Sequence, residues 1–130
     1  MKKIKEGHKI IPIGVYPEKH EHDTADFFLK LGKDVYFIKP SRTKKTKNAD
    51  VIIDGVVWEM KSPIGRGKEN LEHAFKAAVK QSENIIFDLR RSKIPEQKAL
   101  AKLQRELRLS KKAKRLLVIT KQGEKFDFFK

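Results

Sequence analysis

Apolar and polar positions alternate along the chain in two distinct ways, which separate predicted strands from predicted helices. Short apolar runs that end in polar or glycine-containing segments predict strands, and these cover residues 35–38, 50–53, 56–61, 84–89, 116–120 and 126–129. Apolar residues at helical spacing predict helices over residues 17–32, 69–82 and 95–109. This order of elements predicts an α/β fold with a central mixed sheet flanked by helices.

The first residues of the chain give weaker signals than the rest. Residues 1–9 are rich in lysine and are expected to form a flexible basic tail on a single domain that spans residues 1–130. Residues 10–16 are apolar, but Pro12 and Gly14 interrupt them, so we expect at most a short edge strand there. No apolar run approaches the roughly 20 residues that a membrane span needs, and the sequence therefore predicts no transmembrane segment.

The charge of the chain indicates the class of its partner. Lys and Arg together number 31 against 17 Asp and Glu, which gives a formal net charge of +14. A surplus this large on a small domain favours a polyanionic partner, most often nucleic acid. A soluble basic protein, or one that binds anionic lipid, is the alternative. The chain has no cysteine, which excludes disulfide bonds and thiolate metal ligands.

The strongest local signal for chemistry is a predicted hairpin in the first half of the chain. An Asp-Gly pair between two apolar runs is typical of a two-residue hairpin turn, and here it is Asp54 and Gly55. The resulting register places Asp50 opposite Glu59, with both side chains on one face and their Cβ atoms about 5 Å apart. Lys61 shares that face because side chains alternate along a strand. Two opposed carboxylates repel one another, and a divalent cation or a nearby ammonium group would offset this repulsion.

These three charged side chains are the types that metal-dependent hydrolysis of a phosphodiester requires. Mg²⁺ prefers carboxylate oxygens and retains several waters, and it polarises a phosphoryl oxygen and lowers the pKa of a bound water. Lys61 would orient or deprotonate that water, or stabilise the charge that develops on the phosphate. Mg²⁺ is therefore the expected cofactor, with Mn²⁺ or Zn²⁺ as alternatives, and Asp50 and Glu59 are the expected ligands. The alternative is an ordinary surface hairpin whose charges form no site.

A third acid comes from the first predicted helix. Glu21, Ala25 and Phe28 fall at positions i, i+4 and i+7, so Glu21 lies on the apolar side of that helix. It is either a further metal ligand or a half-exposed residue at the edge of the apolar stripe. His20 and His22 flank it, and they either contact substrate or are solvated.

Basic residues surround the predicted centre in the sequence. Six of them are expected to contact the phosphates of a nucleic acid: Arg42, Lys44, Lys45, Lys47, Arg66 and Lys68. The first four precede Asp50 and the last two follow Lys61, so both groups should lie close to the hairpin. Gln81, at the inward edge of the second predicted helix, either hydrogen-bonds a metal-bound water or a phosphate, or borders the core.

The residues of the hairpin resemble a known family of enzymes. Residues 48–50, Asn-Ala-Asp, and residues 58–63, Trp-Glu-Met-Lys-Ser-Pro, resemble the motif of the PD-(D/E)XK nucleases. The resemblance assigns the acid of the motif to Asp50 and its Glu-x-Lys to Glu59 and Lys61. An alanine replaces the proline of the motif, which is not a ligand. The resemblance implies a restriction-endonuclease-like fold, with an α-β-β-β-α-β core followed by a helix and two strands.

A narrower resemblance covers about residues 17–90, which are similar to the C-terminal tRNase domains of contact-dependent growth-inhibition toxins. The shared features are a helical Glu-x-x-Thr-Ala, an Ala-Asp…Asp-Gly-Val…Glu-x-Lys-Ser run and a following Gln-Ser. The resemblance implies catalytic roles for Glu21, Asp50, Glu59 and Lys61. It implies supporting roles for Thr24, Ser62 and Gln81.

This narrower resemblance also implies a biological setting. It implies a toxin domain that cuts tRNA with a divalent metal in the cytoplasm of a target cell, and that a cognate immunity protein neutralises. Delivery as the C-terminal part of a larger secreted or surface protein would follow. The alternatives are a DNA endonuclease of the resolvase or restriction type and a non-catalytic nucleic-acid-binding domain. The presence of Asp50, Glu59 and Lys61 together argues against the last alternative.

Overall fold

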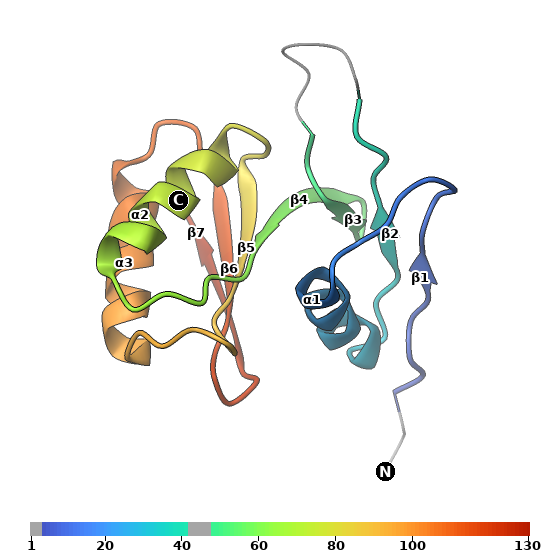
Figure 1. The fold of residues 1–130 in the computed structure, drawn as a ribbon, viewed down its shortest axis with the longest axis horizontal. Coiled ribbons are helices and arrows are strands. Elements are labelled where there is room, and N and C mark those ends of the chain that lie inside the picture. The colour runs from blue at the N-terminus through green and yellow to red at the C-terminus, as the bar shows by residue number, and fades with distance from the viewer. Residues whose placement is uncertain (1–3, 42–47) are drawn as a thin grey trace.

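The computed structural model describes residues 4–41 and 48–130 and shows a seven-stranded sheet with helices on both faces (Figure 1). The strands follow one another across the sheet in chain order: β1 (Lys9–Ile10), β2 (Val35–Phe37), β3 (Val51–Ile53), β4 (Val56–Lys61), β5 (Asn84–Asp88), β6 (Arg115–Ile119) and β7 (Lys125–Phe129). The helices are α1 (Lys19–Lys30), α2 (Lys68–Val79) and α3 (Glu96–Leu109). The predicted α/β fold with a central mixed sheet is therefore confirmed.

The sheet consists of two parts that meet at β4. Strands β2, β3 and β4 form an antiparallel meander, whereas β4, β5 and β6 run parallel to one another. Parallel neighbours need crossover connections, because the chain must return to the same end of the sheet, and α2 and α3 supply them. At the two edges, β1 pairs parallel with β2 and β7 pairs antiparallel with β6. Strand β4 is thus common to both parts.

Each face of the sheet has its own hydrophobic core. On one face, Phe28 of α1 packs against strands of both parts of the sheet, and Figure 1 shows α1 between these two parts. On the opposite face, Phe75 of α2 and Leu103 of α3 cover β5 and β6. The neighbouring residues Ile85 and Ile86 belong to opposite cores, because side chains alternate along a strand.

The turn between β3 and β4 confirms the predicted hairpin. Asp54 has a φ of 52° and Gly55 a φ of 75°, the left-handed values that a two-residue type I′ turn requires at both positions. Aspartate tolerates this conformation better than most residues, and glycine has no Cβ to oppose it. The strands then pair in the expected register, Val51 with Trp58, Ile52 with Val57 and Ile53 with Val56.

Helix α1 is shorter than predicted at its start. It begins at Lys19 rather than at residue 17, with Glu18 as its N-cap. The backbone N–H of Glu18 donates to Glu21 Oε1 at 2.9 Å, which satisfies a donor next to the first helical turn. The other end agrees with the prediction, because the helix ends at Lys30 and Gly32 follows with a φ of 82°.

The flexible tail predicted for residues 1–9 extends too far along the chain, because residues 7–9 are hydrogen-bonded to the rest of the fold. The N–H of Gly7 donates to Leu29 O at 2.8 Å, and the N–H of Val35 donates to His8 O at 2.9 Å. Lys9 then starts β1 and pairs with Asp26, its Nζ 2.6 Å from Oδ1.

Among the described residues no helix combines the length and the apolar character that crossing a bilayer demands.

Candidate functional site

Three charged residues of the hairpin region, Asp50, Glu59 and Lys61, line one open pocket at the C-terminal end of β4. Its volume is about 350 Å³, and α1, β4 and α2 all contribute to its walls. The polar side chains that line it are Glu18, His20, Glu21, Asp50, Glu59, Lys61 and Ser62. Glu59 and Lys61 project to the same face because β4 is extended, and they pair in register with Ile85 and Phe87 of β5.

Asp50 reaches this pocket by leaving the regular ladder. The paired register of β3 and β4 ends at Val51 and Trp58, so the predicted ladder pair of Asp50 with Glu59 is wrong. The N–H of Asp50 donates to Trp58 O at 3.1 Å, and its side-chain Oδ2 accepts from the N–H of Met60 at 2.8 Å. The carboxylate thus takes a hydrogen bond from the backbone of β4, and this contact keeps it beside Glu59.

Burial opposes the ionisation of both carboxyl groups. Burial and then the neighbouring charge of Asp50 raise the pKa of Glu59 to about 8. Burial also raises the pKa of Asp50, although the hydrogen bond from Met60 N–H counteracts this effect. Lys61 offsets part of the repulsion, since its Nζ lies 3.5 Å from Glu59 Oε2. One lysine therefore faces two acids that are poorly solvated.

The second oxygen of Glu59 has no partner. Glu59 is 6% exposed, and its Oε1 is fully buried without a hydrogen bond from any described residue. A buried acceptor in this state carries a large desolvation cost unless something binds it. Carboxylate oxygens are the ligands that Mg²⁺ and Mn²⁺ prefer. The donor set of Asp50 and Glu59 therefore fits a divalent cation.

Glu21 lies in the same pocket and also takes part in capping α1. Its Oε1 caps α1 at Glu18 N, while its negative charge contributes to the raised pKa of Asp50. Glu21 also groups with Glu18 and His20, whose potential ligand atoms lie within 4.8 Å of one another. His22 lies outside the pocket, where its Nδ1 is 3.0 Å from Lys9 Nζ.

The predicted supporting residues hold neighbouring segments in place. Gln81 Oε1 accepts from the N–H of Asn48 at 2.7 Å, which fixes the segment just before Asp50 against the end of α2. Ser62, directly after Lys61, accepts hydrogen bonds from a loop arginine through its carbonyl and hydroxyl oxygens. Thr24 donates its hydroxyl to a buried aspartate on β5.

The predicted phosphate-binding residues are only partly described. Arg42, Lys44, Lys45 and Lys47 lie outside the described residues. Arg66 is exposed in the loop after β4, and Lys68 is the first residue of α2.

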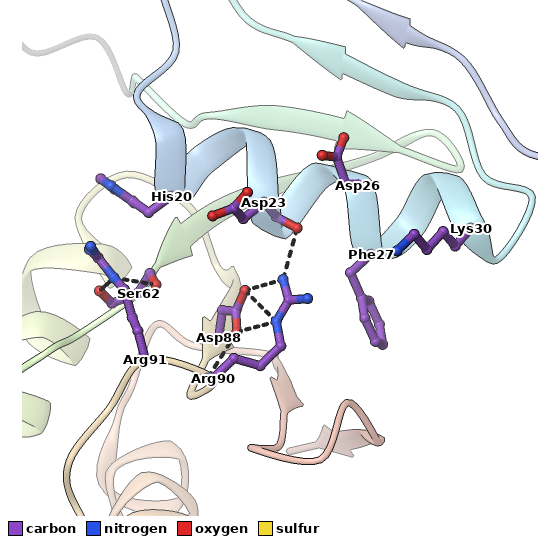
Figure 2. A pocket seen from close by; sticks show the side chains of 9 residues that line it. All are labelled: His20, Asp23, Asp26, Phe27, Lys30, Ser62, Asp88, Arg90 and Arg91. Atoms are coloured by element: carbon purple, nitrogen blue, oxygen red, sulfur yellow. Dashed lines mark hydrogen bonds and ion pairs between the residues drawn. The ribbon is translucent and has the colours of Figure 1, made fainter.

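Sequence reasoning missed a polar cluster beside the pocket (Figure 2). Asp88, 3% exposed at the end of β5, accepts from Arg90 Nε at 3.0 Å and Nη2 at 2.7 Å. Asp88 Oδ2 also accepts from Thr24 Oγ1 at 2.8 Å, and Arg90 Nη2 donates to Asp23 O at 2.8 Å. The hydrogen bonds to Asp88 raise the pKa of Arg90. The available signal was an acid at the end of an apolar strand, followed by two arginines.

The sequence of the chain matches a family of toxin domains over more than half of its length. Residues 47–125 match the family described as contact-dependent growth inhibition CdiA C-terminal domain. The chain belongs to this family, and it is therefore a toxin domain of contact-dependent inhibition.

A solved structure has the same fold. It is described as the CdiA-CT/CdiI toxin and immunity complex from Burkholderia pseudomallei, and it superposes with a TM-score of 0.71 over 95% of this chain and 100% of that chain. The two sequences are 19% identical, so the similarity concerns the fold. No curated protein matches this chain.

Proposed function

We propose that this toxin domain is a metal-dependent endonuclease of the PD-(D/E)XK type, and that its substrate is tRNA. One observation carries the proposal: buried Glu59 has an unpartnered oxygen, next to Asp50 and Lys61, in a pocket open to solvent. Such an arrangement destabilises the fold without a ligand. Strongly perturbed acids in a cleft are typical of functional sites.

The three side chains have two tasks in this mechanism. Asp50 and Glu59 would hold Mg²⁺, which when bound lowers the pKa of a water and polarises the phosphoryl oxygen. Lys61 orients the attacking water or stabilises the negative charge on the phosphate. Met60 N–H keeps Asp50 aimed at the pocket through its 2.8 Å hydrogen bond. Glu21 adds a further carboxylate at the rim.

The choice of tRNA rests on charge and on resemblance. The net charge of +14 suits a polyanion, and residues 17–90 resemble the tRNase domains of contact-dependent growth-inhibition toxins. A DNA endonuclease would need the same three residues, so the substrate must be tested directly.

The test is incubation of the pure domain with total tRNA and, separately, with plasmid DNA. We expect fragmentation of tRNA with Mg²⁺, none with a chelator, and little or no cleavage of DNA. Cleavage of DNA alone would replace the tRNase by the DNA endonuclease. Absence of cleavage with either substrate, with Mg²⁺, Mn²⁺ or Zn²⁺, would leave a nucleic-acid-binding domain.

We infer that a cognate immunity protein binds and neutralises this chain. The support is family membership and the shared fold with a toxin that was solved with its immunity protein. The toxin would act in the cytoplasm of the target cell after delivery as the C-terminal part of a larger protein. Expression of the wild type inside bacteria should stop growth, whereas the inactive variant Lys61→Ala should not.

A further inference from the structure

A second pocket adjoins the proposed catalytic pocket. Its volume is about 310 Å³, and it shares His20 and Ser62 with the catalytic pocket, so the two cavities are neighbours. Three cationic side chains line it, Lys30, Arg90 and Arg91. Its three carboxylates each have a cationic partner: Asp23 pairs with Lys19, Asp26 with Lys9 and Asp88 with Arg90.

The two arginines of this pocket differ in how they are paired. Arg90 is neutralised, because its guanidinium forms two parallel contacts with Asp88. Arg91 is held by neutral acceptors only, since its Nε donates to the carbonyl and the hydroxyl of Ser62, both at 2.9 Å. No carboxylate pairs with Arg91 among the described residues. Arg91 therefore has an oriented guanidinium with an uncompensated charge.

The turn that carries Arg91 is fixed at both ends. Before it, the pairing of Asp88 with Arg90 and Thr24 ties the end of β5 to α1. After it, the N–H of Ser92 donates to Leu89 O at 3.0 Å, which closes the turn. Figure 2 shows the Arg91 side chain extending to Ser62, on the side of the pocket where His20 lies.

We propose that Arg91 binds the RNA phosphate next to the scissile one, which makes the second pocket a substrate subsite. The inference rests on the proposed nuclease function, because it places a phosphate at Lys61. Ser62 follows Lys61 directly, so an arginine anchored on Ser62 lies beside the reacting centre. With Nε engaged, both Nη groups are left for a bidentate contact with phosphate oxygens, which a guanidinium makes better than an ammonium.

The test measures binding and cleavage separately for Arg91→Ala, Arg91→Lys and a matched control. Binding of total tRNA is measured in chelator, where the proposed cleavage cannot occur, as a function of salt. Arg108→Ala is the control, since it removes an equal charge from an exposed position in the last turn of α3, outside both pockets. Arg91 is exposed, so its loss should leave the melting temperature unchanged.

We expect Arg91→Ala to weaken binding about tenfold, the effect of losing one charge-assisted contact. The log–log salt slope should fall by about 0.7–0.9, as for one phosphate contact. Arg91→Lys should keep most of the slope and lose part of the affinity, because lysine lacks the Nε that Ser62 holds. In cleavage assays with Mg²⁺, KM should rise about tenfold while kcat changes little.

Three results would overturn the inference. The first is unchanged binding and salt slope in Arg91→Ala, and the second is an equal loss in Arg108→Ala. The third is a fall in kcat without a change in KM, which would mean that Arg91 acts only in the transition state. If the wild type cleaves no nucleic acid, the proposed function fails, but the binding series in chelator still decides whether Arg91 contacts a phosphate.

Discussion

Glu59 and Asp88 are buried acids on the neighbouring parallel strands β4 and β5, and their surroundings are opposite. Asp88 has a full set of partners in Arg90 and Thr24. Glu59 has one lysine at 3.5 Å and an oxygen without a partner, and it faces a second acid, Asp50. Both side chains are almost inaccessible to solvent, since Asp88 is 3% exposed and Glu59 is 6% exposed. Burial alone therefore does not distinguish a structural acid from a functional one, whereas the state of its partners does.

The comparison has a physical basis. A buried carboxylate with an arginine and a hydroxyl keeps its charge, and it joins segments that are distant in sequence. A buried carboxylate beside another acid is costly until a cation or a proton neutralises it. On this basis, substitutions at Glu59 and Lys61 should affect chemistry, and substitutions at Asp88 should affect stability.

The largest expected effect is on cleavage. Lys61→Ala should lower the single-turnover rate by about 10²–10³, the usual effect of removing one preorganised charge-stabilising group. Glu59→Ala should be at least as severe, because it also removes a ligand of the proposed metal. Glu59→Ala should not lower the melting temperature, because it removes one of two acids that repel each other. Lys61→Ala should leave the protein folded with a slightly lower melting temperature, because Lys61 offsets part of that repulsion.

A matched lysine provides the control for this experiment. Lys111 is exposed and lies outside the pocket, so Lys111→Ala should cleave at close to the wild-type rate. A near wild-type rate for Lys61→Ala would contradict the nuclease mechanism and leave a basic binding domain as the better interpretation.

The second prediction concerns the other acid. Asp88→Ala should lower the free energy of unfolding by about 2–3 kcal/mol, because it leaves Arg90 without its ion pair and Thr24 without its acceptor. This is less than for a fully buried pair, since the Arg90 side chain is 34% exposed. Urea unfolding measures the change. A stability loss larger for Glu59→Ala than for Asp88→Ala would reverse the comparison.

The contrast between the two acids also marks the limit of what the sequence predicts. The hairpin could be predicted because its register depends on two adjacent residues, Asp54 and Gly55, that determine the turn. Helices and strands followed from local periodicity. The pairing of Asp88 with Arg90 is local in sequence, but its hydrogen bond from Thr24 spans 64 positions of the chain, and no local pattern encodes that distance.

Two further differences have similar causes. Asp50 leaves the ladder: its N–H donates to the carbonyl oxygen of Trp58, the residue that pairs with Val51, and its side chain accepts from Met60 N–H. Such side-chain competition for backbone hydrogen bonds is not visible in the periodicity of the sequence. Lys9 starts a strand because it pairs parallel with Val35 of β2, again a long-range contact. The sequence therefore predicted which residues form the candidate centre, but it did not predict their exact geometry.

The third prediction concerns stability and pH in the absence of metal. Unfolded glutamate ionises near pH 4.5, whereas folded Glu59 keeps its proton until about pH 8, so the folded state holds the extra proton between these values. Stability therefore falls as the pH rises through this window. Glu59→Gln cannot ionise, so it does not lose stability over this pH window. In chelator, the melting temperature of Glu59→Gln should therefore exceed that of the wild type by more at pH 8.5 than at pH 6.

Mg²⁺ should reverse the order of the two melting temperatures at pH 8.5, so that the wild type melts above Glu59→Gln. Mg²⁺ should raise the melting temperature of the wild type at pH 8.5, because it binds the folded state, and it should have little effect on Glu59→Gln. Asp88→Asn is the matched control, since it alters a buried acid outside the proposed metal site and should retain the Mg²⁺ response. An equal Mg²⁺ response in the wild type and Glu59→Gln would exclude Glu59 as a ligand.

The smallest expected effect is at Gln81, which holds the segment that leads into Asp50. Gln81→Ala removes the acceptor for Asn48 N–H, a contact of 2.7 Å, whose loss should cost about 1 kcal/mol in the placement of Asp50. We expect cleavage to fall about fivefold, with the melting temperature almost unchanged. Gln81→Glu keeps an acceptor at the same distance and should restore most of the rate. If both variants lose the same activity, Gln81 acts directly on substrate or metal, and the positioning role is wrong.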